Sequence, residues 1–153
     1  MTSATSVPRV LAALVDLAER TPGLGGDGIQ VIDGQPMVKQ DPDLIVVGYS
    51  PVRPTTEINQ SRQNMAATRD QEVYDLPILL ASERGDPDMR LVRDVVEGMV
   101  NAFNTALVAD RRLGGACLMA QISAITWEQA AVEGGGVAAT AEVIVTVTAM
   151  TSR

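Results

Sequence analysis

The chain has 153 residues, of which 46% are apolar and 20% charged, with a net charge of −7 and an isoelectric point near 4.5. This composition excludes a disordered chain, and the acidic balance excludes a protein that binds nucleic acid by neutralising phosphates. With one cysteine and no histidine, the sequence also excludes an intrachain disulfide framework, zinc sites built from Cys and His, and catalysis that needs histidine.

The length suits one domain with its own core, and we expect residues 1–153 to form it. No stretch reaches the roughly 18 continuous apolar residues of a membrane span, and MTSATSVPR lacks the pattern of a signal peptide. We therefore expect a soluble, unsecreted protein in a reducing compartment, with no membrane contact.

The first third of the chain predicts one helix and two short strands. Ser6 is placed to cap a helix with an apolar stripe, which ends at Thr21-Pro22-Gly23. IQVID at 29–33 predicts a short strand. DLIVVGY at 43–49 predicts a second strand, whose apolar run indicates burial on both faces.

A long polar segment separates these strands from the next one. We interpret residues 50–69 as a long loop or extended excursion, with a partly paired strand near 65–69. EVYDLPILLAS at 72–82 predicts a strand. Because Pro77 has no N–H group, we expect this strand at an edge of the sheet.

The second half predicts a long helix and a hairpin. Asp86 is expected to cap the helix, with Pro87 at its first position and its end near Asp110. Odd positions from 137 to 147 are all apolar, which is the strongest strand signal in the chain. Residues 117–128 are the expected partner strand.

The order of elements predicts an α+β fold. We expect a single mixed or mostly antiparallel sheet, two main helices packed on one face, and a long C-terminal β-hairpin. Packing both helices on one face covers both of their apolar stripes.

The segment ADRRLGGACLMA at 109–120 resembles a phosphate-binding loop only in composition. Phosphate loops place glycines before a helix, whereas Gly114-Gly115 follow one, so we interpret them as closing the helix. Arg111 and Arg112 complement the negative end of the helix dipole. Cys117, with no histidine to activate it, is expected to be a packed core residue.

The remaining carboxylates do not predict a metal site. Asp86 and Asp88 are better explained by helix capping, and Asp41 and Asp43 flank a proline in a turn. We therefore assign no catalytic residue, no cofactor and no metal ligand.

Contacts between subunits are the functional sites that the sequence supports. Arg90, Arg93 and Asp94 are expected on a solvated helix face, with the alternative that these arginines meet acidic groups of a neighbouring subunit. Trp127, the only tryptophan, is expected to pack at a strand end, or else to anchor an interface. The candidate interface residues are Arg90, Arg93, Arg111, Arg112 and Trp127.

The order of these motifs resembles the tail terminator proteins of long-tailed phages, the minor tail protein U-like family. The parallels span most of the chain. They comprise the N-terminal helix, Ile32-Asp33-Gly34-Gln35-Pro36, Ile45-Val46-Val47-Gly48, Gly85-Asp86-x-Asp88 with Arg93 in the next helix, Leu113-Gly114-Gly115 and a valine-rich last strand. Family members tend to have small or polar residues where this chain has Arg111-Arg112, so these arginines either cap the helix only or also face a partner.

The resemblance implies a structural virion protein in the phage tail, assembled in the bacterial host cytoplasm, with no enzymatic activity. It implies a ring, most simply a hexamer, that caps the tail tube, stops its elongation and joins it to the head-side connector protein. DNA would pass through the lumen without specific binding, which an acidic lumen favours. The 50–69 segment and the C-terminal hairpin are then candidates for contacts with neighbouring subunits or the tube.

Two alternatives remain open. The first is another head–tail connector or neck protein of similar fold. The second is a small-molecule-binding α+β domain, which requires polar groups such as Glu142, Arg90 and Tyr74 to converge in one pocket.

Overall fold

The computed structural model describes residues 4–37, 39–52, 58–66 and 69–152. Two helices and six strands follow the expected order, so the α+β class is confirmed. In chain order they are α1 (Val7–Arg20), β1 (Gln30–Asp33), β2 (Asp43–Val47), β3 (Gln60–Ala66), β4 (Arg69–Arg84), α2 (Met89–Ala109), β5 (Met119–Val132) and β6 (Gly136–Ser152), with 3-10 turns at Gly25–Asp27 and Leu113–Gly115.

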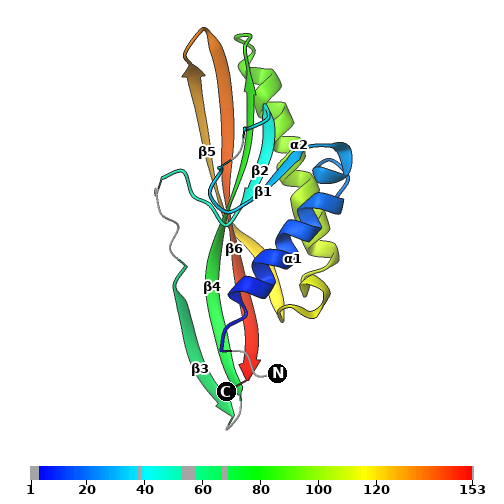
Figure 1. The fold of residues 1–153 in the computed structure, drawn as a ribbon, viewed down its shortest axis with the longest axis vertical. Coiled ribbons are helices and arrows are strands. Elements are labelled where there is room, and N and C mark those ends of the chain that lie inside the picture. Colours follow the sequence, from blue (N-terminus) through cyan, green and yellow to red (C-terminus); the bar gives the residue numbers. More distant parts are fainter. Residues whose placement is uncertain (1–3, 38, 53–57, 67–68, 153) are drawn as a thin grey trace.

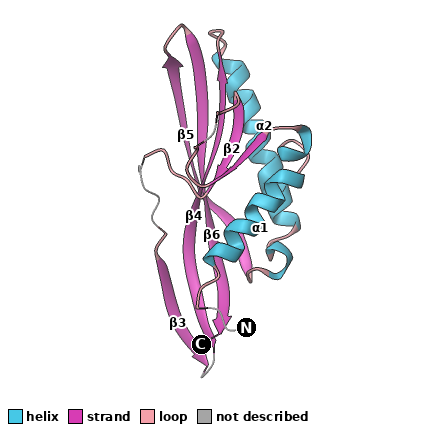
Figure 2. Cartoon of the chain, in the orientation of Figure 1, coloured by secondary structure: helices cyan, strands magenta, loops and turns pink. Residues whose placement is uncertain are grey.

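The six strands form one mixed sheet in the order β1-β2-β4-β6-β5, with β3 paired to β4 below β2. Only β1 and β2 run parallel. The long strands β4 and β6 pair antiparallel along their whole length and extend from one end of the molecule to the other (Figure 1). Both helices lie on one face of the sheet, as expected, which leaves the other face without a helix (Figure 2).

The main core lies between the helices and the sheet. The odd-numbered residues Val137 to Val147 of β6 are buried, as their period-two pattern predicts. They pack with α1, α2 and the alternate residues of β4 that include Tyr74 and Leu80. Phe103 of α2 is the largest fully buried side chain, and each buried residue of this size contributes about 1.5–3 kcal/mol.

The prediction that Pro77 marks an edge strand was wrong, because β4 is central. β6 lies on one side of β4, while β2 and β3 share the other side end to end. The Pro77 carbonyl accepts bonds from Gly48 N (2.9 Å) and Tyr49 N (3.2 Å), so the nitrogen of Pro77 also faces this side, where β2 has just ended. A proline fits there because neither β2 nor β3 needs a donor at that point.

Within the 50–69 segment, β3 begins earlier than expected, at Gln60 rather than near 65. Its polar sequence gives no apolar alternation, and it is ordered instead by pairing with the lower half of β4. The expected strand near 65–69 falls partly on residues 67–68, outside the described residues.

The long helix begins two residues later than expected. Asp88, not Asp86, is the N-cap, and its carboxylate accepts from Leu91 N at 3.1 Å. Pro87 therefore lies just before the helix instead of at its first position. The expected end was right, since α2 stops at Ala109 and Asp110 is the C-cap.

A β-bulge in β5 changes which face its residues occupy. Ile122 pairs with Val145 and Ala124 with Ile144, so Ser123 is an extra residue. Ala124 therefore lies on the helix-free face, although regular alternation predicts it beside Ala120 and Ile122. After the bulge, Ile125 and Trp127 occupy the helix-bearing face instead.

The start of α1 is fixed by a carboxylate from the sheet. The Ser6 side chain makes no bond to the helix that it caps. Instead, Ser6 N (3.0 Å) and Ser6 Oγ (2.8 Å) both donate to the fully buried Glu72, and Ser6 Oγ also lies 2.7 Å from Tyr74 Oη. This carboxylate at a helix N-terminus joins α1 to β4.

Candidate assembly surface

β5 is an edge strand with a free outer side. At its start, Ala120 N donates to Arg111 O at 2.7 Å, so the turn after α2 covers the first residues of the edge. Above that point, no backbone hydrogen bond reaches the outer side of β5 from the part of the chain that the structure describes. The strand therefore presents a row of unpaired N–H and C=O groups between Ile122 and Ala131.

This edge has few of the features that usually protect an exposed strand. Monomeric proteins blunt such edges with lysines, prolines, β-bulges, short length or inward-pointing charges. β5 has the bulge at Ser123, but it is 14 residues long, contains no Lys, Arg or Pro, and carries one charge, Glu128. Its sequence thus favours pairing with another strand over remaining in solvent.

Large apolar side chains lie uncovered along the same edge. Ile125 is 42% exposed and Trp127 is 45% exposed, although both are on the face that carries the helices. Their cross-strand partners on β6, Val143 and Ala141, are fully buried. The cover supplied by the helices therefore does not reach this part of β5, where Ile125 and Trp127 form an open apolar strip.

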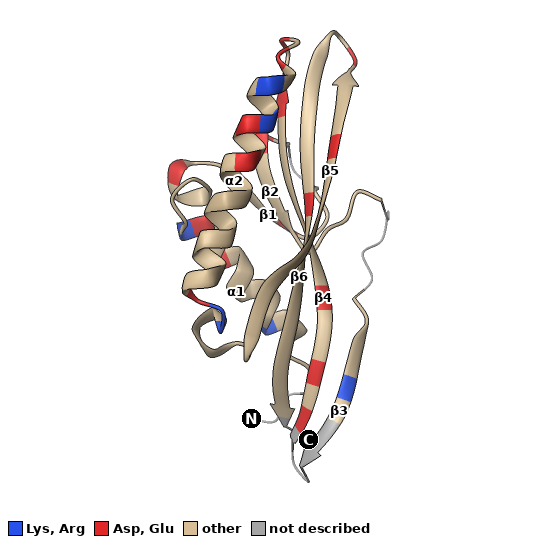
Figure 3. Cartoon of the chain, turned by 180° about the vertical axis from the view of Figure 1, so that it is seen from behind, with Lys and Arg blue, Asp and Glu red and all other residues tan. Residues whose placement is uncertain are grey.

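The helix-free face of the sheet is acidic. In β4 from Asp70 to Arg84, and throughout β5 and β6, the pairing register places four carboxylates and neither Lys nor Arg on this face. The four are Asp75, Glu83, Glu128 and Glu142. Figure 3 shows how the acidic positions are spread along these strands. Thr140, Thr146 and Thr148 lie among them on β6, and Asp75 accepts a bond from Thr146 Oγ1 at 2.7 Å. Such a face repels polyanions.

The candidate interface arginines fall into two separate groups. Arg90 and Arg93 are exposed in the first turns of α2 (Figure 3), and the Arg90–Asp94 pair at 3.8 Å is too exposed to contribute much. Arg111 and Arg112 follow the other end of α2, about 30 Å away for a helix of 21 residues. Trp127 lies on β5, so the structure does not gather the five residues at one site.

Gly114 and Gly115 both have positive φ, as expected, but they do not close α2 directly. They belong to a separate 3-10 turn, and the Asp110 carboxylate accepts from Gly114 N at 3.0 Å. That N–H group is therefore occupied within the chain. Cys117 beside this turn is buried, and burial together with the charge of Asp110 raises the pKa of its thiol.

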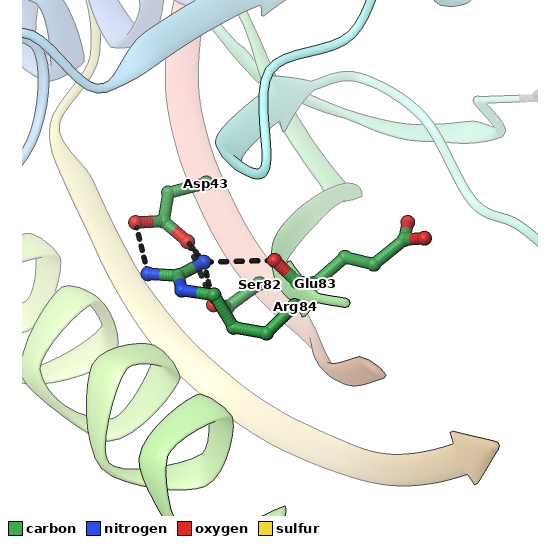
Figure 4. A network of polar contacts seen from close by, with 4 residues as sticks. All are labelled: Asp43, Ser82, Glu83 and Arg84. Carbon is green, nitrogen blue, oxygen red and sulfur yellow. Dashed lines mark hydrogen bonds and ion pairs between the residues drawn. The ribbon is translucent and has the colours of Figure 1, made fainter. Parts of the chain in front are cut away.

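An ion pair closes the upper end of the sheet (Figure 4). Arg84 Nη1 and Nη2 bond Asp43 Oδ1 and Oδ2 at 2.6 and 3.0 Å, and Ser82 Oγ donates to Asp43 Oδ1 at 2.7 Å. Burial raises the pKa of Asp43, but the bonds from Arg84 and Ser82 and the arginine's charge outweigh it, so the pKa is lowered overall. The negative charge of Asp43 thus balances the positive charge of Arg84.

The groups that a ligand-binding domain would need do not converge. Glu142 is on the helix-free face, Tyr74 is buried on the other face, and Arg90 is exposed on α2. A hollow of about 490 Å³ lies above Leu44, Val46 and Leu79, beside the Asp43–Arg84 pair. Among the described residues no three Cys, Asp or Glu side chains gather as metal ligands.

Sequence reasoning missed the free outer edge of β5 and its apolar strip. The only available signal was the absence of Lys and Pro from residues 119–132. The bulge that turns Ile125 and Trp127 to the helix-bearing face has no comparable signal in the sequence.

Comparison with known proteins yields a shared fold. None of the helices in the described ranges is long and apolar enough to cross a membrane. No family model matches the chain, and no curated protein matches it. A chain from the virion of a native gene transfer agent particle is similar in structure over 95% of this chain and 99% of that one, with a TM-score of 0.56 and 12% sequence identity.

Proposed function

We propose that this chain is a structural virion protein of a phage-like particle that assembles into a ring. In this proposal, which follows the resemblance to tail terminators, six copies cap the tail tube, stop its elongation and join it to the head-side connector. The chain acts without catalysis, cofactor or metal.

The observation that carries this proposal is the free edge of β5. A 14-residue edge strand with exposed apolar side chains and no protective charge favours a partner strand. β5 and β1 are opposite edges of the sheet, and a contact between different edges is heterologous, so it builds rings when the rotation closes. The whole-length likeness to a virion chain of a gene transfer agent particle supports the same class of function.

The acidic helix-free face supports one orientation of the subunits in the ring. We place this face toward the central channel and the helices outside. This face has four carboxylates and no Lys or Arg from Asp70 to Arg84 of β4 or in β5 and β6, and this part of it would keep DNA from adhering as it passes.

Negative-stain images of the purified chain at high concentration, with and without tail tubes of the same particle, test the proposal. We expect small rings with a central hole, and tubes capped at one end. Trp127→Lys should abolish the rings, whereas Leu91→Lys, which changes an equally exposed apolar residue on α2, should keep them. Monomers that do not bind the tubes would overturn the proposal. Rings that bind the head-side connector but not the tail tube would favour a connector role.

A further inference from the structure

We infer that residues Ile125–Glu128 of β5 pair with Gln30–Asp33, the strand β1, of the next copy, so that one sheet continues around the assembly. This inference rests on the proposed ring and names the two strands that meet in it.

The register places the two segments at the same height. Following the paired residues across the sheet, Val31, Ile45, Leu80, Ala141 and Trp127 form one row. The neighbouring rows end in Gln30 and Glu128, in Ile32 and Thr126, and in Asp33 and Ile125. Copies in a closed ring are related by rotation without a shift along the axis. With the strands running along that axis, segments at equal height therefore meet.

Strand direction and free backbone groups allow this pairing. β5 is antiparallel to β6, and β1 is antiparallel to β4, so β5 and β1 run in opposite directions and would pair antiparallel. No backbone bond within the described residues reaches the outer side of β1. The loop that follows β1 is bonded to the Gln30 side chain, which donates to Lys39 O at 3.0 Å and accepts from Asp41 N at 2.7 Å, and not to the backbone of β1.

The side chains at the two ends of each row are compatible. Trp127 would lie beside Val31 on the helix-bearing face, an aromatic–β-branched pair of the kind that stabilises sheets. Val31 already packs against the main core, so the indole would extend that core across the contact. Glu128 would face Gln30, and no row places like charges opposite each other.

Disulfide trapping between copies tests the pairing. Two variants, Asp33→Cys and Ile125→Cys, each in a Cys117→Ala background, change exposed residues at the ends of one row. We expect no disulfide in either variant alone and a disulfide-linked dimer when the two are mixed under mild oxidation. A chain with both substitutions should give a ladder that ends at the ring.

The matched control is Asp33→Cys mixed with Gln129→Cys, which lies on the same face but four residues, about 13 Å, farther along the strand. It should give no disulfide. Equal trapping in both mixtures would overturn the register, and trapping in Ile125→Cys alone would show a two-fold contact between β5 strands instead. Rings without the expected disulfide would overturn this inference and leave the proposed function standing, whereas monomers without any disulfide would overturn both.

Discussion

At the scale of single residues, Asp43 joins β2 to the end of β4 through its bonds to Arg84 and Ser82 (Figure 4). In the folded protein the pKa of Asp43 is lowered from 3.8. A carboxyl with a lowered folded pKa contributes stability above its unfolded pKa, and this contribution is lost as the pH falls through the folded pKa.

We therefore predict that Asp43→Asn lowers the free energy of unfolding by about 0.5–1 kcal/mol near neutral pH, because the pair is partly exposed. The difference from the unmodified protein should shrink as the pH falls below 3.8. Urea unfolding at several pH values measures it. Asp41→Asn, an exposed neighbour whose side chain makes no ion pair in the described structure, is the control, and a pH-independent deficit in Asp43→Asn would contradict the assignment.

Other residues show where sequence reasoning reaches its limit. Cys117 was predicted to be a packed core residue because the chain has no histidine to activate its thiol. The burial of Cys117 confirms this prediction. The role of Glu72 could not be predicted, since it depends on Ser6, 66 positions away in the chain. Nothing local distinguishes Glu72 from a solvent-exposed glutamate.

At the scale of elements, the period-two pattern of β6 and the stripes of both helices predicted the elements that build the core. The errors arise where tertiary pairing decides. Pro77 fits a central strand because β2 ends beside it, and polar β3 is a strand because β4 extends past β2. Regular alternation along β5 breaks at Ser123, because a bulge adds a residue without changing the composition of the strand.

The start of α2 offers a test at this scale. Asp88 bonds Leu91 N, whereas the Asp86 side chain bonds no helix N–H in the described structure. Asp88→Ala should lower the free energy of unfolding by about 1 kcal/mol. Asp86→Ala, the matched control at the position favoured by sequence, should leave it nearly unchanged. Thermal or denaturant unfolding of the two variants measures this difference. An equal loss of unfolding free energy in both variants would contradict the assignment of Asp88 as the N-cap.

At the scale of the whole molecule, the two faces of the sheet have different tasks in our account. One packs the helices, and the other presents Asp75, Glu83, Glu128 and Glu142 to the proposed channel. The net charge follows directly from the sequence, and the resemblance to tail terminators predicted the ring. It could not predict that these acids share one face, because that depends on the pairing register.

Reversing charge on this face should change how the assembly treats DNA. We predict that Glu83→Lys with Glu142→Lys, two changes away from the β5 edge, makes the assembled protein retain double-stranded DNA at low salt, whereas the unmodified assembly does not. Asp16→Lys with Glu19→Lys makes the same change of charge on the exposed side of α1 and should retain much less. Sedimentation of labelled DNA with the assembly measures this, and equal retention by both variants would remove the support for an acidic channel.

The central claim is that copies join through the edge of β5, and Trp127 reports on that edge directly. It is the only tryptophan in the chain and is 45% exposed in the single copy. The measurement is the emission spectrum of Trp127 over a series of protein concentrations, with the molar mass of each sample determined in parallel. Our account predicts that the emission shifts to shorter wavelength as the mass rises from one copy to a ring, because the indole leaves water. Assembly without a change in emission, or a single copy at every concentration, would contradict it.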